Sequence, residues 1–314
     1  MMKNALYGGV NAAVLTAMNE DLSVDFDRMA AHSQWLLANG CDGLGVLGTT
    51  GEANSIGVNE RMEILEGLVA CGVPAARMMP GTGMPSITDT VLLSKHAASL
   101  GARGVLVLPP YYYKLPSEDG LFAFFSEVVQ RIGSGLPIYL YNFPQQTAIQ
   151  FTFALIARLL KTYPGVIRGA KDSSGNFENT GGMAKEFGKD GFEVYAGDDA
   201  LLHGLLKVGG AGCITAASNV SCGWNQEVCQ TWNSPTGDAA QARLSAVRKA
   251  VISVPLIPGL KALMARHTGD ARWHNIRPPH LKLTAEQQAT LFANFDASGL
   301  ILAKAAWSAR GRDG

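Results

Sequence analysis

A lysine at the end of an apolar run is the residue with the clearest chemical potential in this sequence. Lys171 follows the run Val166–Ala170, and the strand period of two places it on the same face as Gly169 and Ile167. A free lysine has a pKa near ~10.4, but burial favours the neutral amine, which attacks ketones. The alternative is a buried stem whose ammonium group reaches solvent. Position alone leaves both interpretations open.

A tyrosine ends the apolar run that precedes the lysine. Tyr141 closes Pro137–Tyr141, so its phenol is expected one strand away from Lys171, at the same end of a parallel sheet. A phenol held by hydrogen bonds can relay protons. The alternative is an amphipathic core residue at a strand end.

A threonine pair lies in a glycine-rich loop. The loop Gly48-Thr49-Thr50-Gly51-Glu52 offers hydroxyl and backbone N–H groups that suit a carboxylate, although a turn with nothing bound has the same composition. The overlapping stretch Gly43–Gly48 matches GxGxxG. Its first two glycines fall inside an apolar run rather than in a strand-to-helix turn, so dinucleotide binding is not expected.

Three adjacent tyrosines, Tyr111 to Tyr113, follow another apolar run. They are packing residues or an exposed aromatic surface, for which a subunit interface is the natural candidate.

Other site chemistries find no support in the motifs. The six histidines include no HExxH pair, and neither a GxSxG elbow nor a Walker A loop occurs. We therefore expect no metal, no serine-hydrolase triad and no P-loop nucleotide.

Eight short apolar runs, separated by amphipathic segments, are the elements that must position these residues. The runs are Gly9–Leu15, Gly43–Leu47, Arg77–Pro80, Gly104–Leu108, Pro137–Tyr141, Val166–Ala170, Phe192–Ala196 and Ala211–Ala216. The amphipathic segments are Phe26–Ala38, Glu60–Ala70, Ile87–Leu100, Leu121–Arg131 and Phe153–Leu160. Strands that are apolar on both faces are typical of parallel sheets, and eight repeats favour a closed (β/α)8 TIM barrel, an α/β fold. The carboxyl ends of such strands carry the catalytic loops of barrel enzymes.

After the eighth run only helical patterns occur, broken by prolines. We expect a barrel domain at residues 1–223 and a C-terminal helical extension, residues 224–314, packed on it.

Composition limits the partners. Of the residues, 47% are hydrophobic and 17% charged, and 26 Lys+Arg balance 26 Asp+Glu. A neutral chain offers no electrostatic surface for nucleic acid or an anionic membrane, and no apolar run of membrane-spanning length occurs. Five cysteines without CxxC pairing fit a reducing cytoplasm. We expect a cytoplasmic protein with neither nucleic-acid nor membrane partners.

Five ordered motifs together resemble the dihydrodipicolinate synthase/N-acetylneuraminate lyase family. They are Gly48-Thr49-Thr50-Gly51-Glu52, Pro110-Tyr111-Tyr112, Tyr141-Asn142-Phe143-Pro144, Gly169-Ala170-Lys171-Asp172 and Gly197-Asp198-Asp199. The resemblance implies a class I aldolase or lyase that needs no cofactor, uses pyruvate or another 2-oxo acid as substrate, and forms a homotetramer built as a dimer of dimers.

The resemblance also implies site roles. Lys171 forms a Schiff base with the ketone, Tyr141 shuttles protons, and Thr49 links Tyr141 to a tyrosine of a neighbouring subunit, Tyr112, with Tyr111 or Tyr113 as alternatives. Gly48, Thr49 and Thr50 hold the substrate carboxylate. Gly197 and Ile214 match positions that line the pocket.

One residue departs from the family pattern. Gln146 stands where dihydrodipicolinate synthases carry an arginine for the second substrate's carboxylate, and a neutral amide cannot replace that charge-assisted contact. We therefore expect an aldolase or dehydratase acting on a 2-keto-3-deoxy sugar acid. The alternatives are a dihydrodipicolinate synthase, which condenses pyruvate with aspartate semialdehyde, and a barrel that binds a 2-oxo acid without turnover.

Overall fold

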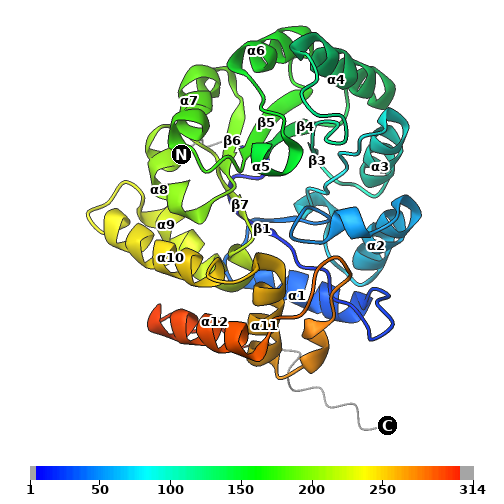
Figure 1. Ribbon diagram of the computed structural model, residues 1–314. Helices are drawn as coiled ribbons and strands as arrows, with labels where there is room; N and C mark the ends of the chain where they lie inside the picture. Colours follow the sequence, from blue (N-terminus) through cyan, green and yellow to red (C-terminus); the bar gives the residue numbers. More distant parts are fainter. Residues whose placement is uncertain (1–4, 305–314) are drawn as a thin grey trace.

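A parallel barrel forms the centre of the computed structural model, which describes residues 5–304 (Figure 1). Seven parallel strands pair in the order β2-β1-β7-β6-β5-β4-β3. They are β1 (Gly9–Ala13), β2 (Gly43–Gly45), β3 (Val105–Val107), β4 (Ile138–Asn142), β5 (Ile167–Asp172), β6 (Glu193–Ala196) and β7 (Gly212–Thr215). Apart from Arg168 in β5, every residue of these strands is buried, as expected for strands covered on both faces.

The expected third strand, Arg77–Pro80, closes the gap between β2 and β3. Met78 forms a parallel bridge with Leu44 on one side, and Gly81 forms one with Leu106 on the other. The run ends in a proline, which has no N–H to donate, so the segment pairs through isolated bridges and forms no regular strand. The TIM-barrel prediction is thus confirmed, with seven regular strands and one bridged segment.

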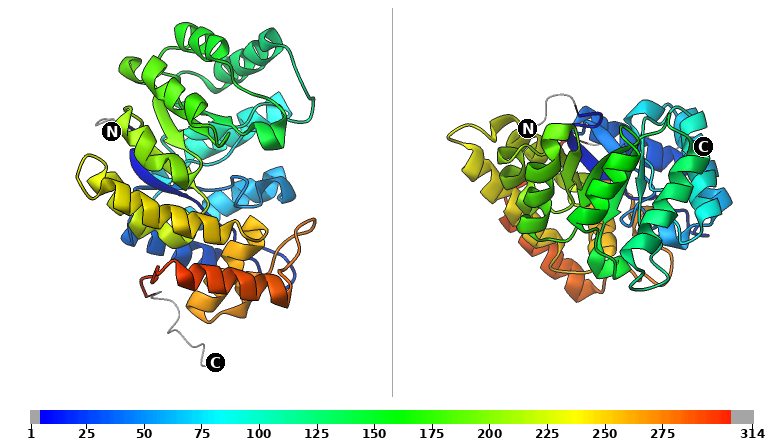
Figure 2. Two further views of the ribbon diagram at one scale, coloured as in Figure 1. Left: turned by 60° about the vertical axis from the view of Figure 1, so that its left-hand side comes forward. Right: turned by 90° about the horizontal axis from the view of Figure 1, so that it is seen from above.

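Helices surround the barrel on its outside (Figures 1 and 2). They are α1 (Phe26–Ala38), α2 (Val58–Ala70), α3 (Ile87–Ser99), α4 (Glu118–Ile132), α6 (Phe153–Thr162), α7 (Phe177–Phe187) and α8 (Leu202–Lys207). The short helix α5 (Pro144–Thr147) follows β4 directly and lies over the carboxyl end of the barrel. Side chains directly before four of these helices help to start them: Asp25, Ser86, Ser117 and Thr152 each accept a hydrogen bond from a backbone N–H in the first turn. Short 3₁₀ turns lie at Ala53–Ser55, Ala75–Arg77, Gly188–Asp190, Asp199–Leu201 and Ala271–His274.

Four helices follow the last strand: α9 (Ser218–Thr231), α10 (Gly237–Val251), α11 (Leu256–Thr268) and α12 (Ala285–Ala297). The last three lie together against one side of the barrel, and α12 begins with a capping box at Thr284. The boundary expected after residue 223 falls inside α9, and the division into two units stays a prediction. None of the helices in residues 5–304 is long and apolar enough to cross a bilayer.

The amino-terminal end of the barrel is filled by a buried polar cluster around Glu193, the first residue of β6. Its carboxylate accepts hydrogen bonds from the phenols of Tyr139 and Tyr195, both at 2.8 Å, and from Arg168 Nε at 2.8 Å. Burial first, and then the Glu193 charge, raise the pKa of Tyr139. Its phenol therefore stays a neutral donor. Because this end of the barrel is closed, a site must open at the carboxyl ends of the strands.

Two glycines of the GxGxxG match have a packing role. A Cβ at Gly43 would lie 2.3 Å from Asn11 Oδ1, and one at Gly45 would lie 3.1 Å from Ile214 Cγ2. These glycines allow β2 to approach the neighbouring strands closely.

Candidate active site

Lys171 and Tyr141 lie side by side at the carboxyl ends of β5 and β4. The two residues are Cα partners in the parallel ladder, so their side chains point to the same side of the sheet. Lys171 Nζ lies 4.2 Å from the centroid of the Tyr141 ring, and the two residues are only 5% and 3% exposed. The sequence-based expectation of an amine beside a phenol is therefore met by the geometry.

The ends of these two strands are fastened by a carboxylate next to the lysine. Asn142 Nδ2 donates to Asp172 Oδ1 at 2.7 Å, and Ser174 Oγ and Thr180 Oγ1 donate to Asp172 Oδ2. Asn142 Oδ1 accepts in turn from the backbone N–H of Phe151. This network holds the backbone that carries Lys171 in one position.

The loop after β2 brings a hydroxyl to the phenol. Thr49 Oγ1 and Tyr141 Oη are 3.4 Å apart, and either can donate. The loop backbone is unusual, because Leu47 and Glu52 both adopt left-handed conformations, with φ of 55° and 58°. Thr16 Oγ1, in the segment that follows β1, donates to Gly51 O at 2.7 Å and supports this turn.

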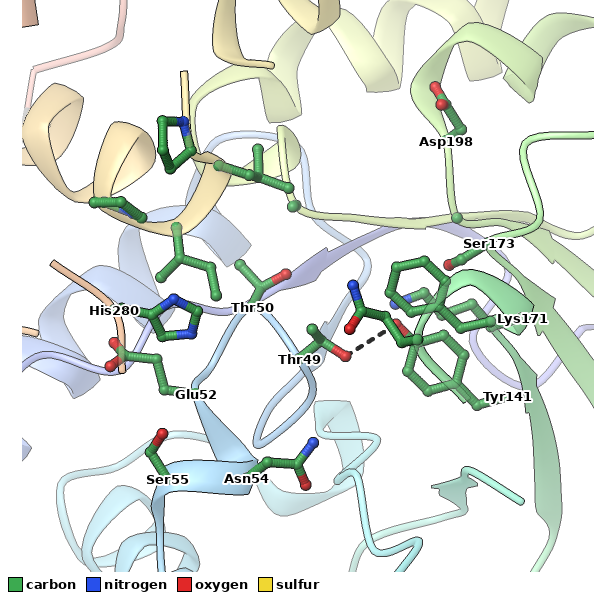
Figure 3. Close-up of a pocket in the computed structure, with 18 of the residues that line it drawn as sticks. Thr49, Thr50, Glu52, Asn54, Ser55, Tyr141, Lys171, Ser173, Asp198 and His280 are labelled. Atoms are coloured by element: carbon green, nitrogen blue, oxygen red, sulfur yellow. Dashed lines mark hydrogen bonds between the residues drawn. The ribbon is translucent and has the colours of Figure 1, made fainter. Parts of the chain in front are cut away.

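A cavity of about 550 Å³ opens above the amine and the phenol (Figure 3). Six of the residues expected at the site line it: Thr49, Thr50, Tyr141, Gln146, Lys171 and Gly197. Gln146, in α5, is exposed at this cavity, so solvent screens any charge that binds beside it. Ser173 and Asn54 add further polar groups to the wall.

Three expected residues do not line this cavity. Ile214 is buried inside the barrel, packed in one cluster with Tyr195 and Tyr141, and Gly48 lies in the loop without reaching the cavity wall. Tyr112 is 72% exposed. The structure brings none of these three into the cavity of the single chain.

Of the three adjacent tyrosines, one is hydrogen-bonded within the chain and two are exposed. The phenol of Tyr111 donates to Asn54 Oδ1 at 2.9 Å within the same chain, and burial raises its pKa. Tyr112 and Tyr113 are exposed, and their rings meet edge to face at 5.3 Å.

A buried ion pair anchors the threonine loop to the C-terminal helices, and the sequence analysis missed it. Glu52 forms an ion pair with Lys261 Nζ of α11, and the two side chains are 0% and 1% exposed. Glu52 Oε2 also accepts from the backbone N–H of Arg277 at 3.1 Å. Burial lowers the pKa of Lys261, and the Glu52 charge opposes that shift. The sequence does contain a signal for a buried charge at this position, because Lys261 is the lone charged residue in the apolar stretch 256–265.

A second pair of opposite charges lies in the cavity wall itself. Arg248 of α10 lies 3.3 Å from Asp198, measured from Nε to Oδ1, and both residues line the cavity. Asp198 belongs to the motif Gly197-Asp198-Asp199, for which the resemblance implied no role of this aspartate. Nothing in the sequence distinguishes Arg248 from Arg243 and Lys249, the other basic residues of the same helix.

Among residues 5–304, no group of three or more His, Cys, Asp or Glu side chains is placed to hold a metal ion.

Comparisons with known proteins identify the family of this chain. The family model described as "Dihydrodipicolinate synthetase family" matches residues 6–297. An "Uncharacterized DapA-like lyase" from Chloroflexus aurantiacus is 34% identical over 291 residues, which cover 92% of this chain and 96% of that protein. A 4-hydroxy-tetrahydrodipicolinate synthase from Listeria innocua is 38% identical over 226 residues, which cover 72% of this chain and 73% of that one.

Solved structures show the same relationship. The crystal structure of dihydrodipicolinate synthase from Agrobacterium tumefaciens aligns with a TM-score of 0.84 at 34% identity, covering 92% of this chain and 98% of that chain. YagE, a prophage protein from E. coli K12 crystallised with pyruvate, aligns with a TM-score of 0.86 at 28% identity, covering 95% and 100%. The protein described here therefore belongs to the dihydrodipicolinate synthetase family and is a lyase of the Schiff-base, pyruvate-using type.

Proposed function

We propose that Lys171 is the residue that forms the Schiff base, with the ketone of pyruvate or of a longer 2-oxo acid. The observation that carries the proposal is the buried Nζ of Lys171 beside the Tyr141 ring, at one end of a cavity of about 550 Å³. The amine attacks the ketone carbon to give a carbinolamine, whose oxygen leaves as water to give a protonated imine.

The imine then acts as an electron sink. When the proton of the C4 hydroxyl is removed, the C3–C4 bond breaks and its electrons form an enamine, while the aldehyde leaves. The enamine takes a proton at C3, and water hydrolyses the pyruvyl imine to free Lys171.

Tyr141 moves protons in these steps. Its phenol lies beside Lys171 and within 3.4 Å of Thr49 Oγ1, so it can deliver a proton to the departing carbinolamine oxygen and recover it through the threonine. Thr49 and Thr50 offer hydroxyl and backbone N–H donors to the carboxylate of the 2-oxo acid.

The second substrate separates two candidate activities. Gln146 lines the cavity at the place of an expected arginine, which favours a 2-keto-3-deoxy sugar acid over aspartate semialdehyde. The alternative is 4-hydroxy-tetrahydrodipicolinate synthase, favoured by the names of several relatives. Comparing kcat/KM for sugar-acid cleavage with that for aspartate-semialdehyde condensation decides between them, and a tenfold advantage for the semialdehyde would establish the alternative.

The assembly we propose is a homotetramer made of two dimers, in which a tyrosine of one subunit reaches the neighbouring site. Exposed Tyr112, Tyr113 and Leu115 support it, because they gather large apolar surface in one loop. With Tyr111 bonded inside its own chain, Tyr112 and Tyr113 remain the candidates. The cytoplasmic location also stays a prediction.

Trapping with borohydride tests the mechanism. Incubation with pyruvate and sodium borohydride should attach one reduced pyruvyl group, located on Lys171 by peptide mapping. Lys171→Ala should lose the adduct and all turnover. Lys161→Ala removes an exposed lysine at the end of α6 and should keep both. An adduct on another lysine, or none with any 2-oxo acid, would refute the proposal.

A further inference from the structure

We propose that Asp198 and Arg248 together form the subsite for the hydroxyl-bearing tail of the 2-oxo acid. The inference rests on the proposed Schiff-base function and adds to it the residues that select the substrate. Neither residue touches the reacting carbons in this scheme. Both act on the part of the substrate that becomes the aldehyde.

The pair lies beyond Lys171, toward the mouth of the cavity. Lys171 pairs with Tyr195 in the ladder, and Asp198 follows three residues later, past the end of β6. Figure 3 shows Ser173 between Lys171 and Asp198, with Thr49 and Tyr141 on the other side of the amine. A chain attached to Lys171 through its ketone and to Thr49 through its carboxylate would therefore extend past Ser173 toward Asp198.

The two side chains keep unused hydrogen-bonding capacity. Arg248 contacts Asp198 at two points, Nε to Oδ1 at 3.3 Å and Nη2 to Oδ2 at 3.4 Å. Charge-assisted N–H···O bonds are normally about 2.7–2.9 Å, so this pairing is loose. Arg248 Nε is buried without a hydrogen bond among the described residues. Asp198 Oδ1 accepts from the backbone N–H of Ala200 at 2.9 Å, which fixes the carboxylate beside the guanidinium.

The charge balance of the pair favours hydroxyls over a second carboxylate. Asp198 neutralises Arg248, so an incoming carboxylate would gain one arginine contact and meet an adjacent negative charge. A hydroxyl can donate to the carboxylate and accept from the guanidinium at the same time. Each such bond to a charged group is worth about 1.5–3 kcal/mol.

Apolar parts of the cavity wall give the tail a second face. Residues Pro255–Pro258, at the start of α11, and Phe143 line the cavity without adding side-chain charge. A carbon chain with its hydroxyls on one side would place them toward Ser173 and Asp198 and its C–H groups toward this wall. A cavity of about 550 Å³ also exceeds the needs of a three-carbon acid.

The test compares two substrates that share the same chemistry. 2-Keto-3-deoxygluconate has hydroxyls beyond C4, whereas 4-hydroxy-2-oxobutanoate ends at C4, and cleavage of either releases pyruvate. The quantity measured is the ratio of kcat/KM for the long substrate to that for the short one. Asp198→Asn and Arg248→Gln should each lower this ratio roughly 10–100-fold, mainly through KM, as expected for a lost charged hydrogen bond.

Asp296→Asn serves as the matched control. It removes the carboxylate of an exposed ion pair with Arg266, and it should keep the wild-type ratio. Thermal unfolding checks that each variant is folded. Arg248→Lys, which keeps the charge but loses the two-point fork, should lower the ratio as well and replaces Arg248→Gln if that variant unfolds.

Each result has a distinct meaning. If wild-type protein forms no borohydride adduct on Lys171, the proposed function fails. If it forms the adduct and cleaves both substrates but the ratio is unchanged in the Asp198 and Arg248 variants, only the subsite is refuted. The subsite is also refuted if Arg248→Gln abolishes condensation with aspartate semialdehyde and leaves the ratio intact, because Arg248 would then bind a carboxylate.

Discussion

Replacing Lys261, a buried residue of α11, by methionine should cost this protein a large part of its stability. The change leaves the Glu52 carboxylate buried and still bonded to the backbone N–H of Arg277, and it removes the 2.7 Å hydrogen bond from Lys261 Nζ to Asn275 O. Breaking one side of a buried ion pair costs about 3–5 kcal/mol, because a desolvated charge is left without its partner.

This cost can be expressed as a melting temperature. Unfolding entropy scales at about 2.1 cal/mol/K per residue, so each degree corresponds to about 0.7 kcal/mol for a chain of 314 residues. Lys261→Met should therefore lower the Tm by roughly 5–8 °C. The KM for pyruvate should rise as well, because Glu52 anchors the loop that carries Thr49 and Thr50.

Differential scanning calorimetry with two companion variants checks the reasoning. Arg266 lies on the same helix as Lys261 and forms an exposed ion pair with Asp296 of α12. Arg266→Met should therefore cost no more than about 0.5 kcal/mol. The double variant Glu52→Gln/Lys261→Met should recover much of the loss, since no unpaired charge remains buried. The account is wrong if Lys261→Met costs under about 1 kcal/mol, or if the double variant is the least stable of the three.

Two further predictions concern assembly and pH. Tyr112→Phe should lower kcat with little change in Tm, because only a hydroxyl is lost, and sedimentation of wild-type protein should show a tetramer; a fully active monomer at micromolar concentration would contradict the shared site. Burial lowers the pKa of His32 from 6.5 to about 4. The unfolded chain therefore binds this proton at a higher pH than the folded chain does. The free energy of unfolding should fall by about 3 kcal/mol in total as the pH drops from about 6.5 to about 4. Urea unfolding between pH 7 and 4 should show a steeper loss in wild type than in His32→Gln, and equal slopes would show that another group is responsible.

The parts of the site that depend on strand order were accessible from the sequence. Lys171 and Tyr141 each lie at the end of a short, mostly apolar run, and parallel strands bring such ends together. Contacts between residues far apart in the sequence could not be predicted from it. Arg248 lies on a helix whose pattern shows a solvated face, and nothing local indicates that it meets Asp198.

Two features of the structure could not be predicted from the sequence, and each has a local cause. The third strand was expected to be regular, but its terminal Pro80 interrupts the hydrogen-bond ladder, leaving the bridges of Met78 and Gly81. The choice among the three tyrosines stayed open in the sequence, because only the position of Asn54 shows that Tyr111 is bonded within its own chain.

The closed end of the barrel has a kinetic consequence. With Glu193, Tyr139 and Tyr195 filling the space at that end, traffic to and from Lys171 passes through the mouth between the threonine loop and the C-terminal helices. In the proposed reaction, the aldehyde occupies that passage after the carbon–carbon bond breaks, and the water that hydrolyses the pyruvyl imine enters by the same way. Under that proposal, the aldehyde departs before water arrives and pyruvate is released, so the shape of the barrel sets the order of product release.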